Sequence, residues 1–471
     1  LDTLSLHDAL PIYTDWGADQ KTLLLLYRSL VRSKLDYGCV VYGSARKSYL
    51  KILDPIHHQG LRICLGAFRT SPKESLYAES GEPPLELRRL RLSMNYFLKV
   101  KASPENPAYD CILNPLYEDK YLRKPNEITP LGIRIRSHLT EAGIDIDSVS
   151  DDPLLTILPP WKLANPNINF HLTAFKKDRT SPAAYKQLYL EQCSQYHGCE
   201  KIFTDGSLRE EKVAAAAVSD RRLNHPTQHR LPDNCSIYSA ELKAIILALK
   251  RVYQSKRSSF VIVSDSLSAL QAISTRKISH PFLAEIHDLH SDLVFDGKEI
   301  VFLWVPSHVG IQGNEIVDRA AKEALELEVQ AQPLQFIPFR DLFRKSKSHC
   351  HQLWQVAWSQ EVNNKLFKTL PDLSDPPPRC GSNRKEETVL ARLHIGHTFV
   401  THSFLLKGEE PPWCFFCDAP YSAAHILTEC SDLLEIKEKF YDSSDLNQIF
   451  REVPLPHICG FLKEINLFSK I

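Results

Sequence analysis

The spacing of apolar residues changes along the chain and divides it into regions of different expected structure. Up to about residue 101, apolar residues recur at the spacing of one helix face, which predicts helices over 19–32, 47–65 and 86–101. From Lys201 the apolar residues instead alternate or form short continuous runs, a pattern typical of strands.

Strand-like runs and helical stretches alternate between residues 201 and 328. The predicted strands cover 201–204, 213–219, 228–231, 260–264 and 300–304. The predicted helices cover 239–253 (with Ser239 as N-cap), 266–274, 281–294 and 314–328. This order predicts an α/β layer fold of about 130 residues.

The segments around this α/β unit carry weaker patterns. Residues 103–198 contain repeated prolines and little periodicity, which predicts a partly ordered connector. Residues 331–471 are less regular than the α/β unit, with predicted helices over 353–366 and within 386–406.

Composition is that of a soluble globular protein, with 43% hydrophobic and 24% charged residues and a formal net charge of zero. The charge is unevenly spread, because residues 13–101 hold 15 Lys and Arg against 8 Asp and Glu. An excess of positive charge suits a phosphate-bearing partner. A merely solvated helical surface explains it equally well.

Several features bear on where the protein resides. No apolar run reaches the roughly 18 residues of a membrane span, and no signal-peptide pattern opens the chain. The 12 cysteines are mostly scattered singly, which favours reduced thiols in an intracellular protein, nuclear or cytoplasmic.

The start of the chain has two unusual features. It opens on Leu1 and its single methionine is Met94, so we expect it to begin inside a longer reading frame. Residues 1–12 have no evident relation to the rest of the chain. Foreign and native origins both remain open, and these residues are left out of the fold prediction.

Four acidic residues occupy inward positions of the predicted α/β unit. Asp205 follows the first predicted strand, and Asp265 follows the buried strand 260–264. Glu241 and Asp318 each continue the apolar stripe of a predicted helix, where an unpaired charge is costly. Carboxylates that converge in this way need cations between them, and oxygen ligands suit Mg²⁺ or Mn²⁺.

Each acid taken alone is more often a turn, cap or surface residue, but four at matching positions favour a site. Two bridged metal ions about 4 Å apart would activate a water and stabilise the leaving 3′-oxygen of a phosphodiester. His308 lies in a loop before the last helix and would move protons or assist product release. An ordinary loop histidine is the alternative.

Five separated motifs carry a family resemblance: Phe203-Thr-Asp-Gly-Ser, Ser239-Ala-Glu-Leu, Ser264-Asp-Ser, Val305-Pro-Ser-His and Gly313-Asn-Glu. Their order and spacing resemble type 1 ribonuclease H over about 201–328. The resemblance implies a five-stranded mixed sheet with helices on both faces and Mg²⁺-dependent cleavage of RNA in RNA–DNA hybrids. It makes the four acids metal ligands and His308 the loop histidine, with Ser207 and Asn314 flanking the hybrid. Val317 departs from the alanine usual in the family at that position, without removing a ligand.

The first helical region resembles another family. Ser33-Lys-Leu-Asp-Tyr-Gly, Gly66-Ala-Phe-Arg-Thr-Ser-Pro and Tyr77-Ala-Glu-Ser-Gly-Glu-Pro-Pro-Leu are similar to the segment after the polymerase palm in jockey-like non-LTR retrotransposon reverse transcriptases. The resemblance implies a thumb-like module that grips a duplex, with Arg62 and Arg69 as phosphate contacts. The polymerase's Tyr-x-Asp-Asp turn is not found in the 471 residues, so the polymerase half of such a polyprotein would be a missing partner.

A second cluster has the spacing C-x₂-C-x₇-H-x₄-C, formed by Cys414, Cys417, His425 and Cys430. Three thiolates and an imidazole can complete a tetrahedral structural Zn²⁺ site. Buried free cysteines are the alternative. Trp413 and Phe415 beside the first pair would stack on bases. The arrangement is similar to the C-terminal tail of the jockey-like enzymes.

Together these patterns predict five segments. They are foreign or native residues 1–12, a helical thumb-like module at 13–102, a connector at 103–198, a ribonuclease H domain at 199–330, and a helical tail at 331–471 with a zinc-knuckle-like motif at 414–430. The expected activity is metal-dependent endonucleolytic hydrolysis of the RNA strand of a hybrid. The alternative is a non-catalytic remnant of a transposon that only binds nucleic acid.

Overall fold

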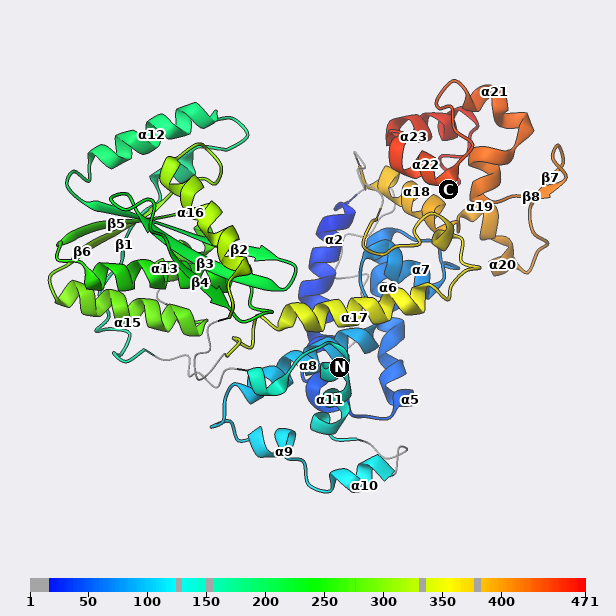
Figure 1. Ribbon diagram of the computed structural model, residues 1–471. Coiled ribbons are helices and arrows are strands. Elements are labelled where there is room, and N and C mark those ends of the chain that lie inside the picture. Colours follow the sequence, from blue (N-terminus) through cyan, green and yellow to red (C-terminus); the bar gives the residue numbers. More distant parts are fainter. Residues whose placement is uncertain (1–16, 124–128, 150–155, 276, 330–335, 377–382) are drawn as a thin grey trace. The chain divides into compact units, whose positions relative to one another are not determined.

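The computed structural model describes residues 17–471 except 124–128, 150–155, 276, 330–335 and 377–382 (Figure 1). The described chain forms two compact units. One takes residues within Leu1–Met94, Tyr117–His138 and Lys347–Ile471, and the other takes residues within Asn95–Leu116 and Leu139–Ser346. The segment 1–12, left open by the sequence, lies outside the described residues.

The second unit is built on a mixed six-stranded sheet in the order β1-β6-β5-β2-β3-β4. Its strands are β1 (Asn167–Asn169), β2 (Glu200–Arg209), β3 (Lys212–Ser219), β4 (Thr227–Leu231), β5 (Ser259–Ser264) and β6 (Glu299–Trp304). The chain segments β2, β3 and β4 pair antiparallel, whereas β1, β6, β5 and β2 pair parallel. The mixed α/β architecture and the five predicted strands are therefore confirmed. The expected strand number of five is wrong, because β1 adds a sixth strand beside β6.

Helices cover both faces of this sheet (Figure 1). One face packs on α13 (Ile237–Gln254), α14 (Leu267–Thr275) and α15 (Pro281–Phe295). The other packs on α12 (Pro182–Ser194) and α16 (Gln312–Glu323). Alternate residues of each central strand point to opposite faces, so that Phe260 and Ile262 of β5 contact the first helix layer while Val261 and Val263 contact the second.

Residues expected to form a connector contribute to this unit. β1 pairs with β6 from Asn167↔Val301 to Asn169↔Leu303. The short 3₁₀ helix η4 (His171–Ala174) comes next, and α12 buries Tyr185 and Tyr189 against the sheet. The same stretch of sequence also holds α9 (Tyr109–Leu113), α10 (Glu118–Arg123), α11 (Leu131–Glu141) and η3 (Ile146–Ser148).

The first unit is helical. Its N-terminal part runs through α2 (Gln20–Leu26), the π-helix η1 (Tyr27–Arg32), α3 (Ser33–Asp36), α4 (Cys39–Tyr42), α5 (Lys47–Leu50), η2 (Lys51–Leu53), α6 (Asp54–Leu65) and α7 (Lys73–Ser80), and α8 (Leu85–Lys101) begins in this unit. Its C-terminal part takes up α17 (Phe343–Trp358) from Lys347 onward and continues through η6 (Leu366–Lys368), α18 (Arg384–Ile395), α19 (Phe399–His402) and α20 (Phe404–Lys407). The helix predicted over 353–366 is displaced, since α17 starts earlier and ends at Trp358.

Both parts of the first unit share one hydrophobic core. Leu23, Leu61 and Leu65 from the N-terminal part pack with Trp358 and Ile395 from the C-terminal part. Arg384 adds hydrogen bonds to the carbonyl oxygens of Cys64 (2.7 Å) and Ile63 (2.8 Å). The thumb-like segment and the tail are thus packed together, although the whole second unit lies between them along the sequence.

The end of the chain forms a second core within this unit. It comprises the hairpin β7 (Trp413–Cys414) with β8 (Ala419–Pro420), the π-helix η7 (His425–Glu429), η8 (Ser431–Leu433), α21 (Leu434–Lys437), α22 (Leu446–Glu452) and α23 (Leu455–Glu464). Among the described residues, no helix is both long and apolar enough to cross a membrane.

Candidate active site

Two of the predicted acids lie where neighbouring strands separate. The parallel pairing of β2 with β5 ends at Thr204↔Ser264, and Asp205 in β2 and Asp265 after β5 are the next residues along the chain. β2 does not end there, because its antiparallel pairing with β3 continues to Arg209↔Lys212. The sequence expectation that Asp205 ends its strand is therefore wrong in detail. The two carboxylates nevertheless meet at the carboxyl edge of the parallel strands, where ligand sites of α/β sheets form.

The third acid, Glu241, approaches from helix α13. This helix packs closely on β2 at Gly206, where an added Cβ would lie 2.8 Å from the Ala240 Cβ and 2.9 Å from the Glu241 backbone nitrogen. Glycine at position 206 therefore permits the close approach. One carboxylate oxygen from each of Asp205, Glu241 and Asp265 lies within 4.8 Å of the others.

The buried Oε2 of Glu241 has no hydrogen-bond partner among the described residues. An unpaired carboxylate oxygen that is shielded from water is costly unless a cation completes its environment. The oxygen-only donor set is the one that Mg²⁺ and Mn²⁺ prefer. The three residues thus fit a divalent cation.

The fourth acid, Asp318, lies on α16 and is less buried. Its Oδ2 accepts a hydrogen bond from the Nζ of Lys322 at 2.7 Å, one helical turn further on. Asp318 also offers an oxygen to a second cluster with His308 and Glu315, whose ligand atoms lie within 4.8 Å of one another. Asp318 is therefore close enough to raise the pKa of Asp205 and of Asp265, and it also lies beside the loop that carries His308.

Burial and mutual repulsion change the acidity of this site. Burial, followed by the charges of Asp265 and Asp318, raises the pKa of Asp205 to about 8. Burial also raises the pKa of Glu241 well above its usual value, with Asp205 and Asp265 adding to the shift. The pKa of Asp265 is raised by burial, although a hydrogen bond from Asn314 and the nearby His308 act in the opposite direction. Without a cation the site therefore retains protons near neutral pH.

The other residues assigned to this site by resemblance lie close to it in different ways. Asn314 is buried at the start of α16 and donates from Nδ2 to Oδ2 of Asp265 at 3.2 Å. Ser207 is buried in β2, two residues after Asp205. His308 is exposed and has a left-handed backbone φ of 57°, which is uncommon for a residue with a side chain.

The N-terminus of α13 is held by a residue that sequence reasoning missed. The N-cap is Ser236, not Ser239 as the sequence predicted, since the Ser236 hydroxyl accepts from the backbone N–H of Ser239 at 3.1 Å. The buried Asp341 accepts from the backbone N–H of Ser236 (2.8 Å) and from the hydroxyls of Ser236 (2.8 Å) and Ser239 (2.5 Å). No motif marked Asp341, which lies far beyond the acid-bearing motifs in the sequence.

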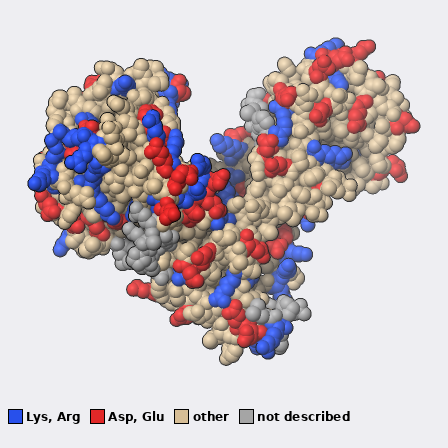
Figure 2. Space-filling view, viewed as in Figure 1, with Lys and Arg blue, Asp and Glu red and all other residues tan. Residues whose placement is uncertain are grey.

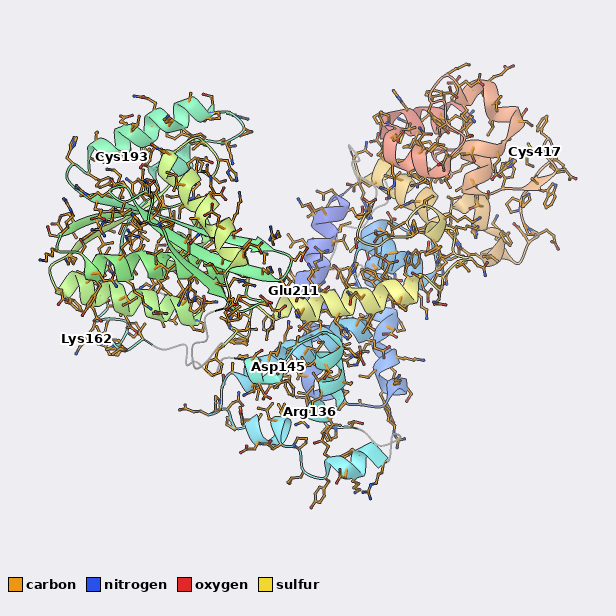
Figure 3. All side chains as sticks on the ribbon, viewed as in Figure 1. Arg136, Asp145, Lys162, Cys193, Glu211 and Cys417 are labelled. Atoms are coloured by element: carbon orange, nitrogen blue, oxygen red, sulfur yellow. The ribbon has the colours of Figure 1, made fainter. Side chains whose placement is uncertain are left out.

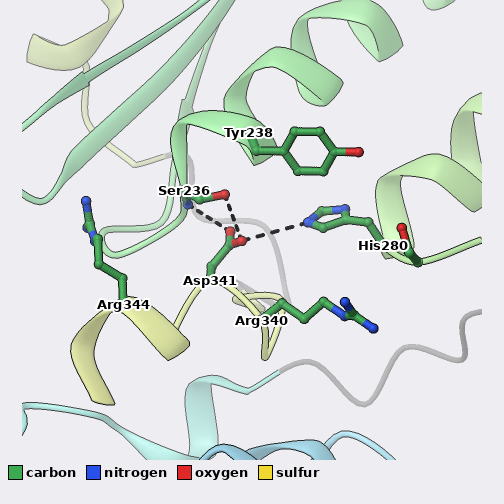
Figure 4. Close-up of a pocket in the computed structure, with 7 residues that line it drawn as sticks. Ser236, Tyr238, His280, Arg340, Asp341 and Arg344 are labelled. Atoms are coloured by element: carbon green, nitrogen blue, oxygen red, sulfur yellow. Dashed lines mark hydrogen bonds and ion pairs between the residues drawn. The ribbon is translucent and has the colours of Figure 1, made fainter. Parts of the chain in front are cut away.

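A pocket of about 400 Å³ opens beside these residues and also brings His280 close to Asp341 (Figure 4). Ser239, His280 and Asp341 are the residue types of a hydrolytic triad, but their hydrogen bonds exclude that role. The Ser239 hydroxyl donates to Asp341, and His280 uses Nδ1 to accept from the Phe282 N–H at 3.2 Å. The proton of His280 is then on Nε2, which faces Ser239 at 2.9 Å, so no base is available to activate the serine.

The predicted zinc ligands converge in the first unit. Cys414, Cys417, His425 and Cys430 each place one ligand atom within 4.8 Å of the others. The Sγ atom of Cys430 lies 3.9 Å from that of Cys414 and 3.8 Å from that of Cys417. Sulfur atoms bound to one tetrahedral Zn²⁺ are about 3.8 Å apart. The buried Nε2 of His425 has no hydrogen-bond partner among the described residues, so these four residues fit zinc.

The hydrogen bonds of Cys417, which is labelled in Figure 3, favour its thiolate form. Hydrogen bonds from the Ser431 hydroxyl and backbone N–H lower the pKa of Cys417 to about 7. Burial instead raises the pKa of Cys430 to about 11. Only a bound cation would favour the thiolate forms of both residues together.

The remaining predicted nucleic-acid contacts are spread over the first unit. Arg69, Trp413 and Phe415 are exposed, with 93% of the Phe415 surface accessible. Arg62 is half-buried, donates to Gln59 at 3.3 Å, and its Nε is buried without a partner among the described residues. Acidic and basic side chains are interspersed on the visible surface, in keeping with the zero net charge (Figure 2).

Comparison with protein families identifies the domain that contains the four acids. Residues 198–326 match the family model of RNase H. The matched residues include β2 to β6 of the sheet, helices α13 to α16, and all four acids with His308. Together with the mixed sheet and its two helix layers, the match supports an RNase H domain in the second unit.

Proposed function

We propose that this protein hydrolyses the RNA strand of RNA–DNA hybrids, using divalent cations held by Asp205, Glu241, Asp265 and Asp318. One observation carries the proposal. Three carboxylates from two strands and a helix converge within 4.8 Å in an RNase H domain, and one of their buried oxygens has no partner among the described residues. The raised pKa values of Asp205 and Glu241 support it, since such a site is stable at neutral pH only with protons or cations.

When bound, two Mg²⁺ or Mn²⁺ ions supply an activated water and stabilise the leaving 3′-oxygen of the phosphodiester. The protein's own residues prepare that chemistry. Asn314 fixes the orientation of Asp265, and Lys322 restrains Asp318. His308, exposed beside Asp318 and Glu315, is placed to take a proton from solvent-side groups and to return it. The RNA strand would be distinguished by contacts to its 2′-hydroxyls.

We also propose a structural zinc ion at Cys414, Cys417, His425 and Cys430. The separations between the sulfur atoms and the unpartnered nitrogen of His425 support it. The exposed rings of Trp413 and Phe415 next to this site suit stacking on unpaired bases. This region would then hold nucleic acid by stacking, with Arg62 and Arg69 as phosphate contacts in the same unit.

The biological setting we propose is a jockey-like retrotransposon reverse transcriptase polyprotein acting inside the cell. The support is the similarity of residues 33–85 and of the cysteine motif to those enzymes. The polymerase of the same polyprotein is then the expected partner, and the ribonuclease would remove template RNA after first-strand synthesis. The rival function is a remnant that binds nucleic acid without cutting it.

A cleavage assay on a labelled RNA–DNA hybrid with Mg²⁺ separates these functions. Wild type and Asp296→Asn, which changes an exposed acid of the same unit, should cut the RNA strand. Asp205→Asn should lower the rate by at least about 100-fold, as expected when electrostatic stabilisation of the reaction is removed. Cutting by Asp205→Asn at the wild-type rate would contradict the proposed site. Hybrid binding by wild type without any cutting would favour the remnant.

A further inference from the structure

A basic turn outside the RNase H match lies at the same edge of the sheet as the acids. β1 runs parallel to β6, and β6 runs parallel to β5. The carboxyl ends of parallel strands share one edge, so the chain leaving β1 emerges on the side where Asp265 follows β5. After η4 the chain makes a turn, closed by the backbone N–H of Arg179 donating to the carbonyl of Lys176 at 3.0 Å.

A direct contact fixes the position of this turn. The Nζ of Lys177 donates to the hydroxyl of Ser307 at 3.2 Å. Ser307 immediately precedes His308, whose ring lies with Glu315 and Asp318 in one cluster. Lys177 therefore contacts the loop that carries His308, beside the proposed reaction centre. In the sequence, Lys177 precedes residue 198, where the RNase H match begins.

The turn carries three cations in four residues. Lys176, Lys177 and Arg179 are exposed, and so is the intervening Asp178. The Nε of Arg179 lies 4.0 Å from Asp178, and about three quarters of each side chain remain accessible. Such an exposed pair within one turn is weak, so the turn presents a net positive charge to solvent.

The divalent cations proposed at the four acids act on the cleaved phosphodiester, so the neighbouring phosphates of a nucleic acid need positive side chains beyond the reaction centre. Lys322 already forms an ion pair with Asp318. Among the described residues, the cations of the turn form no ion pair with the four acids. They lie next to the histidine loop, where the backbone of a bound duplex would continue beyond the cleaved phosphodiester.

We propose that the turn formed by residues 176–179 binds backbone phosphates of the nucleic-acid substrate, through Lys177 and Arg179 in particular. This inference rests on the proposed function, because it assigns the turn to the substrate of that site. It extends the substrate interface to residues that precede the RNase H match, held at the site by β1.

The test is the salt dependence of hybrid binding. Two double variants of the full chain remove the same charges: Lys177→Ala with Arg179→Ala, and Lys256→Ala with Arg257→Ala. Lys256 and Arg257 are exposed and precede β5, at its amino end and so at the opposite edge of the sheet. Both double variants are combined with Asp205→Asn so that the hybrid is not cut, and binding is measured by fluorescence anisotropy from 50 to 300 mM KCl, about the range in which counterion release is resolved.

Each lost phosphate contact reduces the slope of log Kd against log salt by about 0.9. The turn variant should therefore lose between about 1 and 2 in slope and bind roughly 10-fold more weakly at 100 mM KCl. The opposite-edge variant should match its Asp205→Asn parent. Equal slopes for the two double variants, or a larger loss at the opposite edge, would overturn the inference.

Cleavage by proteins with Asp205 intact separates this inference from the proposed function. The turn variant should raise KM and leave kcat nearly unchanged, since its side chains bind backbone away from the reacting atoms. Absence of cutting in wild type rejects the ribonuclease, whereas normal cutting with equal salt slopes rejects only the role of the turn. Circular dichroism checks that each variant is folded.

Discussion

At the scale of single residues, Asp205 determines the electrostatics of the site. It is 6% exposed and receives repulsion from Asp265 and Asp318. Its pKa of about 8 means that the folded protein without metal holds a proton there that the unfolded chain releases near pH 4. If the proposed cations bind, stability and metal binding are therefore linked through this carboxyl group.

The first prediction concerns stability against pH in the absence of metal. Between about pH 4 and pH 8 the folded state binds more protons at Asp205 than the unfolded state does, so the free energy of unfolding falls as pH rises through this window. Asp205→Asn removes the ionisable group, and should raise the free energy of unfolding by about 5 kcal/mol at pH 8 while changing it little at pH 4.

Urea unfolding in EDTA at several pH values measures this effect. Asp296→Asn is the matched control, because Asp296 is exposed and the same amide replaces its carboxylate. If Asp205→Asn and Asp296→Asn show the same dependence on pH, Asp205 does not carry a raised pKa. Added Mg²⁺ should reverse the order of wild type and Asp205→Asn, since only wild type gains the full binding free energy.

The sequence reveals the acids of the site but not all of their contacts. Asp205 and Asp265 follow apolar strands, and Glu241 interrupts an apolar helix stripe, so their inward positions could be predicted. The link between Lys322 and Asp318 also has helical i, i+4 spacing. Oε2 of Glu241, in contrast, has no hydrogen-bond partner among the described residues, and nothing in the sequence signals this.

At the scale of elements, the placement of α13 decides where Glu241 lies. Gly206 permits the helix to contact β2, and Asp341 holds the first turn of the helix through three hydrogen bonds. A negative charge at a helix N-terminus is favourable because the backbone N–H groups there lack helical partners. Asp341 is thus a positioning residue for Glu241.

The second prediction tests Asp341. In Asp341 each carboxylate oxygen accepts a proton from one serine hydroxyl, Ser236 or Ser239. In Asp341→Asn an NH₂ group, which cannot accept, replaces one of these oxygens. One hydrogen bond is then lost and the first turn of α13 loosens. We expect the free energy of unfolding to fall by about 1 to 2 kcal/mol, the usual cost of losing a helix cap. Mn²⁺ affinity should fall as well, because Glu241 becomes less well ordered.

Urea unfolding and Mn²⁺ titration followed by electron paramagnetic resonance provide the two measurements. Arg340→Gln is the neighbouring control, since Arg340 is exposed and in the pocket its side chain points away from the Asp341 carboxylate (Figure 4). Loss of stability with unchanged Mn²⁺ affinity would leave Asp341 as a cap alone. If the free energy of unfolding and the Mn²⁺ affinity are both unchanged, Asp341 does not position Glu241.

Regular elements were predicted best from sequence where apolar residues set the period. All five strands between 200 and 304 were located, and four of them carry an apolar run, whereas β4 (Thr-Gln-His-Arg-Leu) holds a single apolar residue. β1 reads Asn-Ile-Asn and offers only one apolar residue, so neither period nor length marks it as a strand. It is ordered by pairing with β6, which is a tertiary effect.

At the scale of the whole molecule, the chain folds into units that are not contiguous in sequence. Residues before and after the RNase H domain meet in one helical core, in which Trp358 and Ile395 pack with Leu61. Helical spacing identifies a buried face but not the helix that will cover it. The helical spacing over 47–65 therefore predicted α6 and the burial of Leu61 and Cys64, but it also included Ile56, which is exposed. It did not identify α18 as the partner.

The last prediction concerns the cysteine cluster, which lies beside the terminal core of the first unit. Zinc binding free energy stabilises the structure that holds its ligands, so Cys417→Ser should lose the zinc and speed amide exchange in α22 and α23. Hybrid cleavage should stay within about twofold of wild type, because the four acids belong to the other unit with cores of its own. Cys111→Ser, which alters an exposed free cysteine, is the matched control.

Native mass spectrometry and hydrogen exchange separate the outcomes of this change. One zinc in wild type and in Cys111→Ser, with none in Cys417→Ser, would establish the site. Zinc retained in Cys417→Ser would mean that this thiol is not a ligand. A wild-type protein without zinc would mean that the cluster consists of free thiols and an imidazole. Loss of cleavage together with loss of zinc would instead show that the two units depend on each other, which their separate cores argue against.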